Sequence, residues 1–174
     1  TEICGHWYFI EAGGVTPRPA RNMLVALYPS PMGPATRTTT TDSTGYFQFP
    51  PIPSGSHGVV KLWAESAHVE VTAEGGGGYS CSVGFQNIPE GLYYIGSCYT
   101  PSGGDTRRAF AIVDTINIGY DFTAELGHSH GKVHVYWPGD ESYSYTEMEV
   151  EYLFDRITVG DNHHIHIQAG DEWF

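Results

Sequence analysis

Histidine is the residue type in this sequence with the clearest potential for metal chemistry. Two segments, Lys132–Trp137 and His163–Gln168, have the alternation of β-strands. If these strands are neighbours, one face of the sheet gathers imidazoles from both, and the loop before the first segment adds two more. The candidate ligands are His134, His164, His166, His128 and His130. Three imidazoles suit Zn²⁺ or Cu²⁺, and a carboxylate such as Asp161 or Asp171 can complete the shell.

A polar sheet face that carries histidines without binding metal is the alternative interpretation of this pattern. The sequence contains no His-Glu-x-x-His motif, so it lacks the helical pair of zinc ligands and the general-base glutamate of zinc peptidases. Calcium is a weaker candidate at Asp140–Ser142 and at the alternating Glu147, Glu149 and Glu151, because no Asp-x-Asp-x-Asp-Gly loop is present. We therefore expect this chain to have no catalytic activity of its own.

Composition and charge narrow the class of protein. The 174 residues carry a formal net charge of −12, from 8 basic and 20 acidic residues, which disfavours binding to nucleic acids and anionic membranes. No apolar run reaches the roughly 18 residues of a membrane span, and the first residue is Thr1 rather than methionine, so we expect a leader peptide to have been removed. Abundant glycine, proline and tyrosine favour a secreted, mainly β protein.

The three cysteines predict an oxidising compartment. Cys81 and Cys98 flank a plausible hairpin turn at Asn87–Gly91, so they are predicted to lie on neighbouring strands and to form a disulfide. Cys4 is then left over, either as a small buried residue or as a bond to another subunit. The alternative is that all three are reduced and buried.

Short strands separated by turn residues predict a β-sandwich in the first hundred residues. The clearest turn is Asp42–Gly45, where the aspartate can accept backbone N–H groups and the glycine can adopt a positive φ. Alternation then predicts the residues of the core: Trp7, Phe9, Leu24, Ala26, Tyr46 or Phe47, Leu62 and Val69.

The order of these elements resembles the carboxypeptidase regulatory-like domain, a transthyretin-like β-sandwich. The resemblance covers about residues 3 to 100 and includes Asn22–Leu27, the Asp42-x-x-Gly45-x-Phe47 turn and Val59–Ala64. It implies an antiparallel, immunoglobulin-like sandwich in an extracellular setting, and it implies little about the ligand.

Residues 104–174 differ in pattern from the predicted sandwich of residues 1–103. The spacing of Ala109, Ile112, Val113 and Ile116 predicts a helix over Arg107–Tyr120, capped by Asp105 or Thr106, that packs against Val133 and Val135. A small α+β region of this kind, after a regulatory-like sandwich, resembles the N-terminal lobe of a secreted zincin-type metallopeptidase. The catalytic helix is absent from it, so no catalytic residue can be carried over.

Three functions fit these observations. The first is a secreted, non-catalytic module that binds other copies of itself or an extracellular surface, which the scarcity of edge-guarding lysine favours, since Lys61 and Lys132 are the only two lysines. The second is the N-terminal fragment of a larger secreted zinc metallopeptidase. The third is a metal-binding protein built on the histidine cluster.

Overall fold

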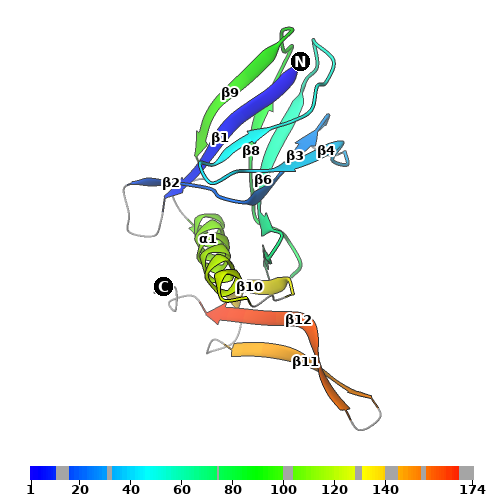
Figure 1. Cartoon of the computed structure of the whole chain (residues 1–174). Coiled ribbons are helices and arrows are strands. Elements are labelled where there is room, and N and C mark those ends of the chain that lie inside the picture. The colour runs from blue at the N-terminus through cyan, green and yellow to red at the C-terminus, as the bar shows by residue number, and fades with distance from the viewer. Residues whose placement is uncertain are drawn as a thin grey trace.

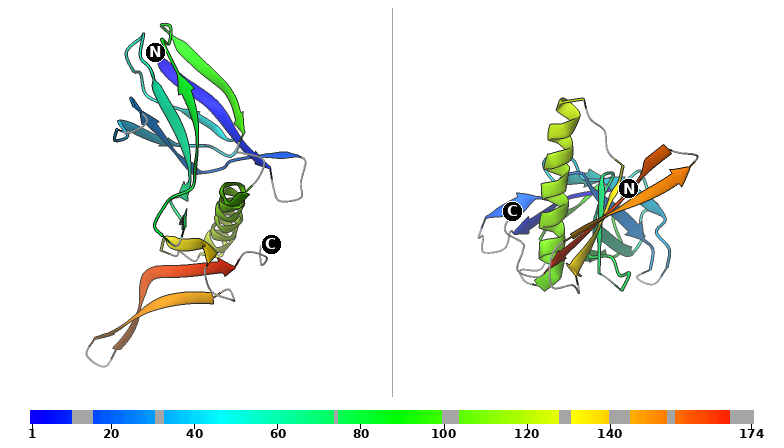
Figure 2. Two further views of the ribbon diagram at one scale, coloured as in Figure 1. Left: turned by 180° about the vertical axis from the view of Figure 1, so that it is seen from behind. Right: turned by 90° about the horizontal axis from the view of Figure 1, so that it is seen from below.

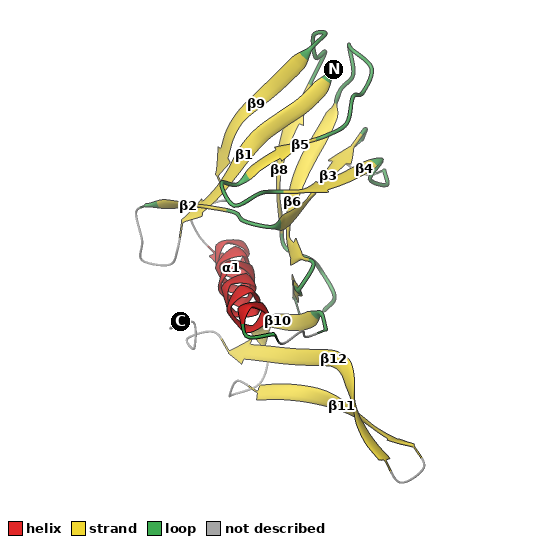
Figure 3. Cartoon of the chain, viewed as in Figure 1, coloured by secondary structure: helices red, strands yellow, loops and turns green. Residues whose placement is uncertain are grey.

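The computed structural model describes residues 1–10, 16–30, 33–73, 75–99, 104–127, 131–139, 145–153 and 156–168, with the backbone alone for Cys98 and for the strand residues after Pro138. These residues form two sheets and one long helix (Figures 1 and 3). The predicted fold class, a mainly β sandwich with a small α+β region, is confirmed. Within the described ranges, no helix is both long and apolar enough to cross a membrane.

The smaller sheet is organised around the first strand, β1 (Glu2–Ile10). Two short strands, β2 (Pro17–Pro19) and β5 (Tyr46–Gln48), pair antiparallel with different parts of β1. The last strand of the sandwich, β9 (Leu92–Tyr99), runs parallel to β1 along most of its length, so the sandwich is not wholly antiparallel as expected. Residues of β1, β5 and β9 therefore meet on one sheet face although they lie far apart in sequence.

The larger sheet continues from the sandwich into the C-terminal region. From edge to edge its strands are β11 (Tyr145–Leu153), β12 (Arg156–Gln168), β10 (Val133–Gly139), β7 (Val69–Thr72), β6 (Gly58–Ser66), β3 (Met23–Tyr28) and β4 (Arg37–Thr40). A further strand, β8 (Ser80–Phe85), pairs with β6. The pairs β7–β10 and β10–β12 are parallel, so the region after residue 104 extends the sheet of the sandwich.

The segment Asn87–Gly91 does not form the hairpin that the sequence predicts. It carries the chain from β8 in the larger sheet to β9 in the smaller sheet, so these two strands are not paired. The reason is visible at Ile88, whose side chain is 1% exposed and belongs to the core. A turn residue that is buried between the sheets pulls the connection across the sandwich instead of back along the same sheet.

Most of the predicted core residues are confirmed, but the face of β3 that enters the core is the opposite of the predicted one. Trp7, Phe9, Phe47, Leu62 and Val69 are buried core residues, as expected, whereas Leu24 is half-buried. Ala26 is buried but lies outside the core cluster, whose contributors from β3 are Met23, Val25 and Leu27. Both faces of β3 are apolar, so alternation alone does not identify the core face.

The predicted turn at Asp42–Gly45 is confirmed. Asp42 Oδ1 accepts hydrogen bonds from the backbone N–H groups of Thr44 at 2.8 Å and Tyr46 at 3.0 Å. Gly45 has φ +80°, and a Cβ at this position would lie 2.4 Å from the carbonyl oxygen of Trp7. The turn therefore requires glycine for both its backbone conformation and its packing.

The helix α1 (Gly104–Glu125) is longer at both ends than the predicted segment and begins before the predicted caps. Ala109, Ile112 and Val113 are buried and Ile116 is half-buried, which confirms the apolar stripe. The helix packs mainly on β6 and β7 and also contacts β10, so the predicted contact is present but is the smaller part of its docking surface. Because β10 joins the edge of β7, the helix lies across the middle of the extended sheet rather than on β10 alone (Figure 1).

Candidate functional site

The structure places part of the histidine cluster on adjacent strands. β10 and β12 are neighbours, and their parallel register pairs His134 with His164 and Tyr136 with His166. The apolar face predicted for β10 is also present, since Val133, Val135 and Trp137 are buried. The remaining two candidates, His128 and His130, lie outside the described residues.

The described side chains of this region do not assemble a metal site. His134 Nδ1 lies 3.4 Å from Glu70 Oε2, and both side chains are more than a third exposed. Within the described part of the chain, no group of three or more histidine, cysteine, aspartate or glutamate side chains is close enough to hold a metal ion. Of the other candidate ligands, Asp140 and Asp171 lie outside the described residues, and only the backbone is described at Asp161, Glu147, Glu149 and Glu151. The zinc, copper and calcium sites therefore stay predictions.

The two cysteines of the predicted disulfide lie in different sheets. Cys81 is a buried residue of β8, and Cys98 belongs to β9, where it pairs in register with Trp7 of β1. The expectation of neighbouring paired strands was therefore wrong, because the connection between β8 and β9 crosses the sandwich. The side chain of Cys98 lies outside the described residues, so the bridge itself stays a prediction. Cys4 is buried, as one of the two expectations for it required.

One side of the sandwich leaves its core partly open to solvent. Val83 on β8 and Tyr93 and Ile95 on β9 pack against the core, yet all three are only partly buried. On the opposite side, Phe47 in β5 and the adjacent Phe49 are at most 1% exposed. We call the region of Val83, Tyr93 and Ile95 the open side of the sandwich.

The open side consists of two strand edges and a hollow. Among the described strands, β8 pairs only with β6 and β9 pairs only with β1, so each has one edge without a partner strand. A pocket of about 500 Å³ lies at this side, and Tyr93, Gly84 and Phe85 are part of its wall. Neither β8 nor β9 contains a charged residue.

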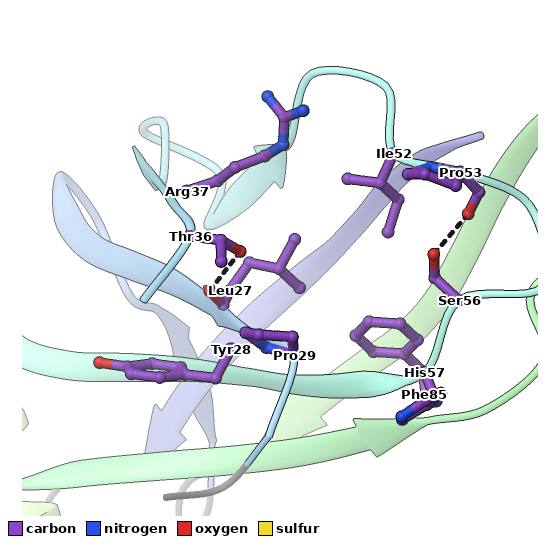
Figure 4. Close-up of a pocket in the computed structure, with 10 residues that line it drawn as sticks. All are labelled: Leu27, Tyr28, Pro29, Thr36, Arg37, Ile52, Pro53, Ser56, His57 and Phe85. Carbon is purple, nitrogen blue, oxygen red and sulfur yellow. Dashed lines mark hydrogen bonds between the residues drawn. The ribbon is translucent and has the colours of Figure 1, made fainter. Parts of the chain in front are cut away.

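A second, smaller pocket of about 250 Å³ lies next to the first and shares Pro29, His57 and Phe85 with it (Figure 4). The hydroxyl of Ser56 donates to the carbonyl of Pro53 at 2.6 Å, and that of Thr36 donates to the carbonyl of Leu27 at 3.2 Å. These hydroxyls therefore hold the walls of the pocket together, which does not resemble the pairing of a nucleophile with a base.

The outer face of the smaller sheet carries a cluster of aromatic side chains. The rings of Tyr8 and Tyr99 stack with centroids 5.5 Å apart. The imidazole of His6 lies 6.1 Å from the ring of Tyr8, 5.2 Å from that of Tyr46 and 6.0 Å from that of Tyr94. Tyr94 is 51% exposed and Tyr99 is 54% exposed. We call these five residues, His6, Tyr8, Tyr46, Tyr94 and Tyr99, the aromatic face.

Hydrogen bonds fix the side chains around this face. Tyr46 donates its hydroxyl hydrogen to Gln48 Oε1 at 2.7 Å, and Gln48 Nε2 donates to Glu2 Oε2 at 2.6 Å. His6 Nδ1 lies 3.1 Å from the Tyr94 hydroxyl. Burial, followed by a hydrogen bond with Cys4, raises the pKa of the Tyr46 hydroxyl, so this tyrosine is neutral at physiological pH. Hydrogen bonds thus position Tyr46 and Tyr94, with the hydroxyl and amide groups of Tyr46 and Gln48 and the carboxylate of Glu2 beside the rings.

Sequence reasoning missed both the open side and the aromatic face. Each depends on β9, which the sequence placed beside β8 rather than beside β1. The signal that was present in the sequence is the run Leu92–Tyr99, a strand without charged residues in a chain of net charge −12.

No protein-family profile and no curated protein matches the sequence. One solved structure, a proposed carbohydrate-binding protein of Pseudomonas aeruginosa, is similar with a TM-score of 0.32 and 20% sequence identity, over 53% of this chain and 86% of that chain.

Proposed function

We propose that this chain is a secreted, non-catalytic module that acts by binding, and that its first partner is another copy of itself. The observation that carries the proposal is the open side, where Val83, Tyr93 and Ile95 pack against the core and reach the surface between two unpaired strand edges. A partner strand at this position would cover apolar surface and supply backbone hydrogen bonds to the exposed edges.

The distribution of charge supports association at this side in particular. The edge strand β11 has three glutamates at alternate positions, and the edge strand β4 contains Arg37. Both strands therefore carry charges of the kind that discourage the addition of another strand. The strands β8 and β9 contain no such charge. The net charge of −12 opposes association in general, so contacts between copies must be specific and are strengthened by salt or divalent cations.

The hairpin of β11 and β12 supports a second copy as the partner. It extends away from the sandwich and from α1, and β11 makes its contacts chiefly with β12 (Figure 2). An extended arm of this kind has little to pack against within its own chain. We therefore expect it to contact the neighbouring copy.

Sedimentation velocity over micromolar protein concentrations at physiological salt tests the proposal. Species larger than the monomer are expected for the natural sequence, and zinc added to the same preparation is expected to produce no peptidase activity, since the motif that would supply it is absent. Val83→Lys places a charge at the open side and should shift the sedimentation toward the monomer.

Thr39→Lys is the matched control. Thr39 is half-buried like Val83, pairs with the core residue Val25, and lies on β4 at the other edge of the sandwich. This variant should associate as the natural sequence does. The proposal is overturned if the protein of natural sequence is strictly monomeric, or if the Val83→Lys variant associates normally. The peptidase-fragment interpretation would then be preferred.

A further inference from the structure

The aromatic face is a second candidate surface, separate from the open side. Its rings project from the outer face of the smaller sheet, whereas Val83, Tyr93 and Ile95 pack against the core between the sheets. The proposed self-association therefore does not use the aromatic face. The partner of this face must be inferred from the chemistry of its own residues.

Two of its tyrosines are too exposed to be explained by packing within the chain. More than half of the surface of Tyr94 and of Tyr99 is accessible, although each contacts a ring on β1. Tyrosine presents a rigid apolar ring and a polar hydroxyl at a low cost in conformational entropy, which makes it a frequent residue of binding surfaces. The two rings are held by His6 and Tyr8, so they are positioned before any ligand arrives.

Charge excludes several classes of ligand at this surface. The strands β1, β5 and β9 contain no lysine or arginine, and their single charged residue is Glu2. The carboxylate of Glu2 accepts a hydrogen bond from Gln48. A phosphate-rich or acidic ligand would find no cation here and would be repelled by a chain of net charge −12.

Neutral hydrogen-bonding groups lie among the rings. Gln48 and Ser97 are exposed, the Tyr94 hydroxyl lies 3.1 Å from His6 Nδ1, and the Tyr46 hydroxyl donates to Gln48 Oε1. A sugar ring matches this combination, since its C–H face packs on an aromatic ring while its hydroxyls exchange hydrogen bonds with amide and hydroxyl groups.

The spacing along the strands indicates the size of the ligand. Tyr94 pairs in register with Cys4 and Tyr99 with Tyr8. Four residues of extended strand span about 13 Å, which is the length of a short oligosaccharide rather than of a single sugar. We propose that the aromatic face binds a neutral oligosaccharide, with Tyr94 and Tyr99 as the stacking residues and Gln48 and Ser97 as hydrogen-bonding partners.

Isothermal titration calorimetry with neutral hexasaccharides of glucose, xylose, mannose and N-acetylglucosamine tests this site in the full chain. At least one hexasaccharide should bind, and its affinity should be nearly independent of salt because neither partner contributes a charge pair. Tyr94→Ala and Tyr99→Ala should each weaken binding roughly 10-fold, the loss expected for an aromatic contact of ordinary strength.

Tyr28→Ala is the control, since Tyr28 is a half-buried tyrosine of β3 in the other sheet, where it lies under the ammonium of Lys61. It should leave the affinity unchanged, and so should Val83→Lys, which separates sugar binding from self-association. The proposal is overturned if none of the hexasaccharides binds, if an acidic oligosaccharide binds instead with strong salt dependence, or if the two tyrosine variants alter sedimentation and not sugar affinity.

Discussion

A buried carboxylate on the helix provides the sharpest test of how α1 is attached to the sandwich. Asp114 has a side chain that is 3% exposed, and its Oδ1 accepts a hydrogen bond from Arg21 Nε at 2.9 Å. Arg21 Nη2 lies 2.8 Å from the same oxygen, and Arg18 Nη2 lies 3.5 Å from Oδ2. The two arginine side chains are 32% and 41% exposed, so the anion is much more deeply buried than the cations.

This asymmetry predicts unequal costs for the two single substitutions. Arg21→Ala leaves a buried carboxylate with the half-exposed Arg18 as its remaining cation and should lower the free energy of unfolding by about 3 kcal/mol, the lower end of the range for breaking a buried pair. Asp114→Ala leaves Arg18 able to turn to water but removes the partner of Arg21 Nη2, which is a buried atom, so its cost should be only somewhat smaller, about 2 kcal/mol. The double variant should cost at least about 1 kcal/mol less than the sum of the two.

Urea unfolding of the natural sequence, the two single variants and the double variant measures these differences, provided that the dependence on denaturant is the same for all four. Arg37→Ala is the control, because this exposed arginine of β4 donates a hydrogen bond to the carbonyl of Pro51 at the surface and should change stability by no more than about 0.5 kcal/mol. If Asp114→Ala costs as much as Arg21→Ala, or if the effects are additive, Asp114 does not anchor the helix in this way.

Two further predictions concern the core and the turn. Ile112→Asp places a charge at a position that is 4% exposed and should lower the free energy of unfolding by at least about 3 kcal/mol, so an unchanged melting temperature would refute the packing of α1. At Asp42 burial raises the pKa of the carboxyl, but hydrogen bonds from Thr44 and Tyr46 outweigh this and lower it below its usual value. A lowered native pKa stabilises the fold above the unfolded value of about 3.9, and the contribution disappears as the pH falls through the native pKa. Natural sequence and Asp42→Asn should therefore differ in stability at pH 6 and converge under acid unfolding, and a difference that grows toward low pH would contradict the geometry of the turn.

The amino-acid sequence by itself determined the features that depend on neighbouring residues. The Asp42–Gly45 turn follows from an aspartate that accepts nearby N–H groups and a glycine that tolerates a positive φ. The apolar stripe of α1 and the buried face of β10 follow from the periods of helix and strand. These signals were enough to predict a mainly β sandwich followed by a helix and further strands.

The tertiary structure decided which elements pair and which faces are buried. β9 joins β1 rather than β8 because Ile88 is buried between the sheets, and no local pattern shows that a turn residue will enter the core. The sequence also left undecided which face of β3 enters the core, since both faces are apolar. The polar contacts of α1 were also missed, because Asp114 and Asn117 interrupt an apolar stripe. Their hydrogen-bond partners are distant in sequence: Arg21 for Asp114, about a hundred positions away, and Ser66 for Asn117, about fifty positions away.

Both candidate binding surfaces share this origin. The aromatic face combines side chains from β1, β5 and β9, and the open side combines β8 with β9. Hydrophobic burial is non-directional, so many pairings of these strands would cover similar apolar area, and sequence alone does not select among them. The pairing of β9 with β1 selects one arrangement, and that single choice both exposes Tyr94 and Tyr99 and leaves the core beside Val83 uncovered.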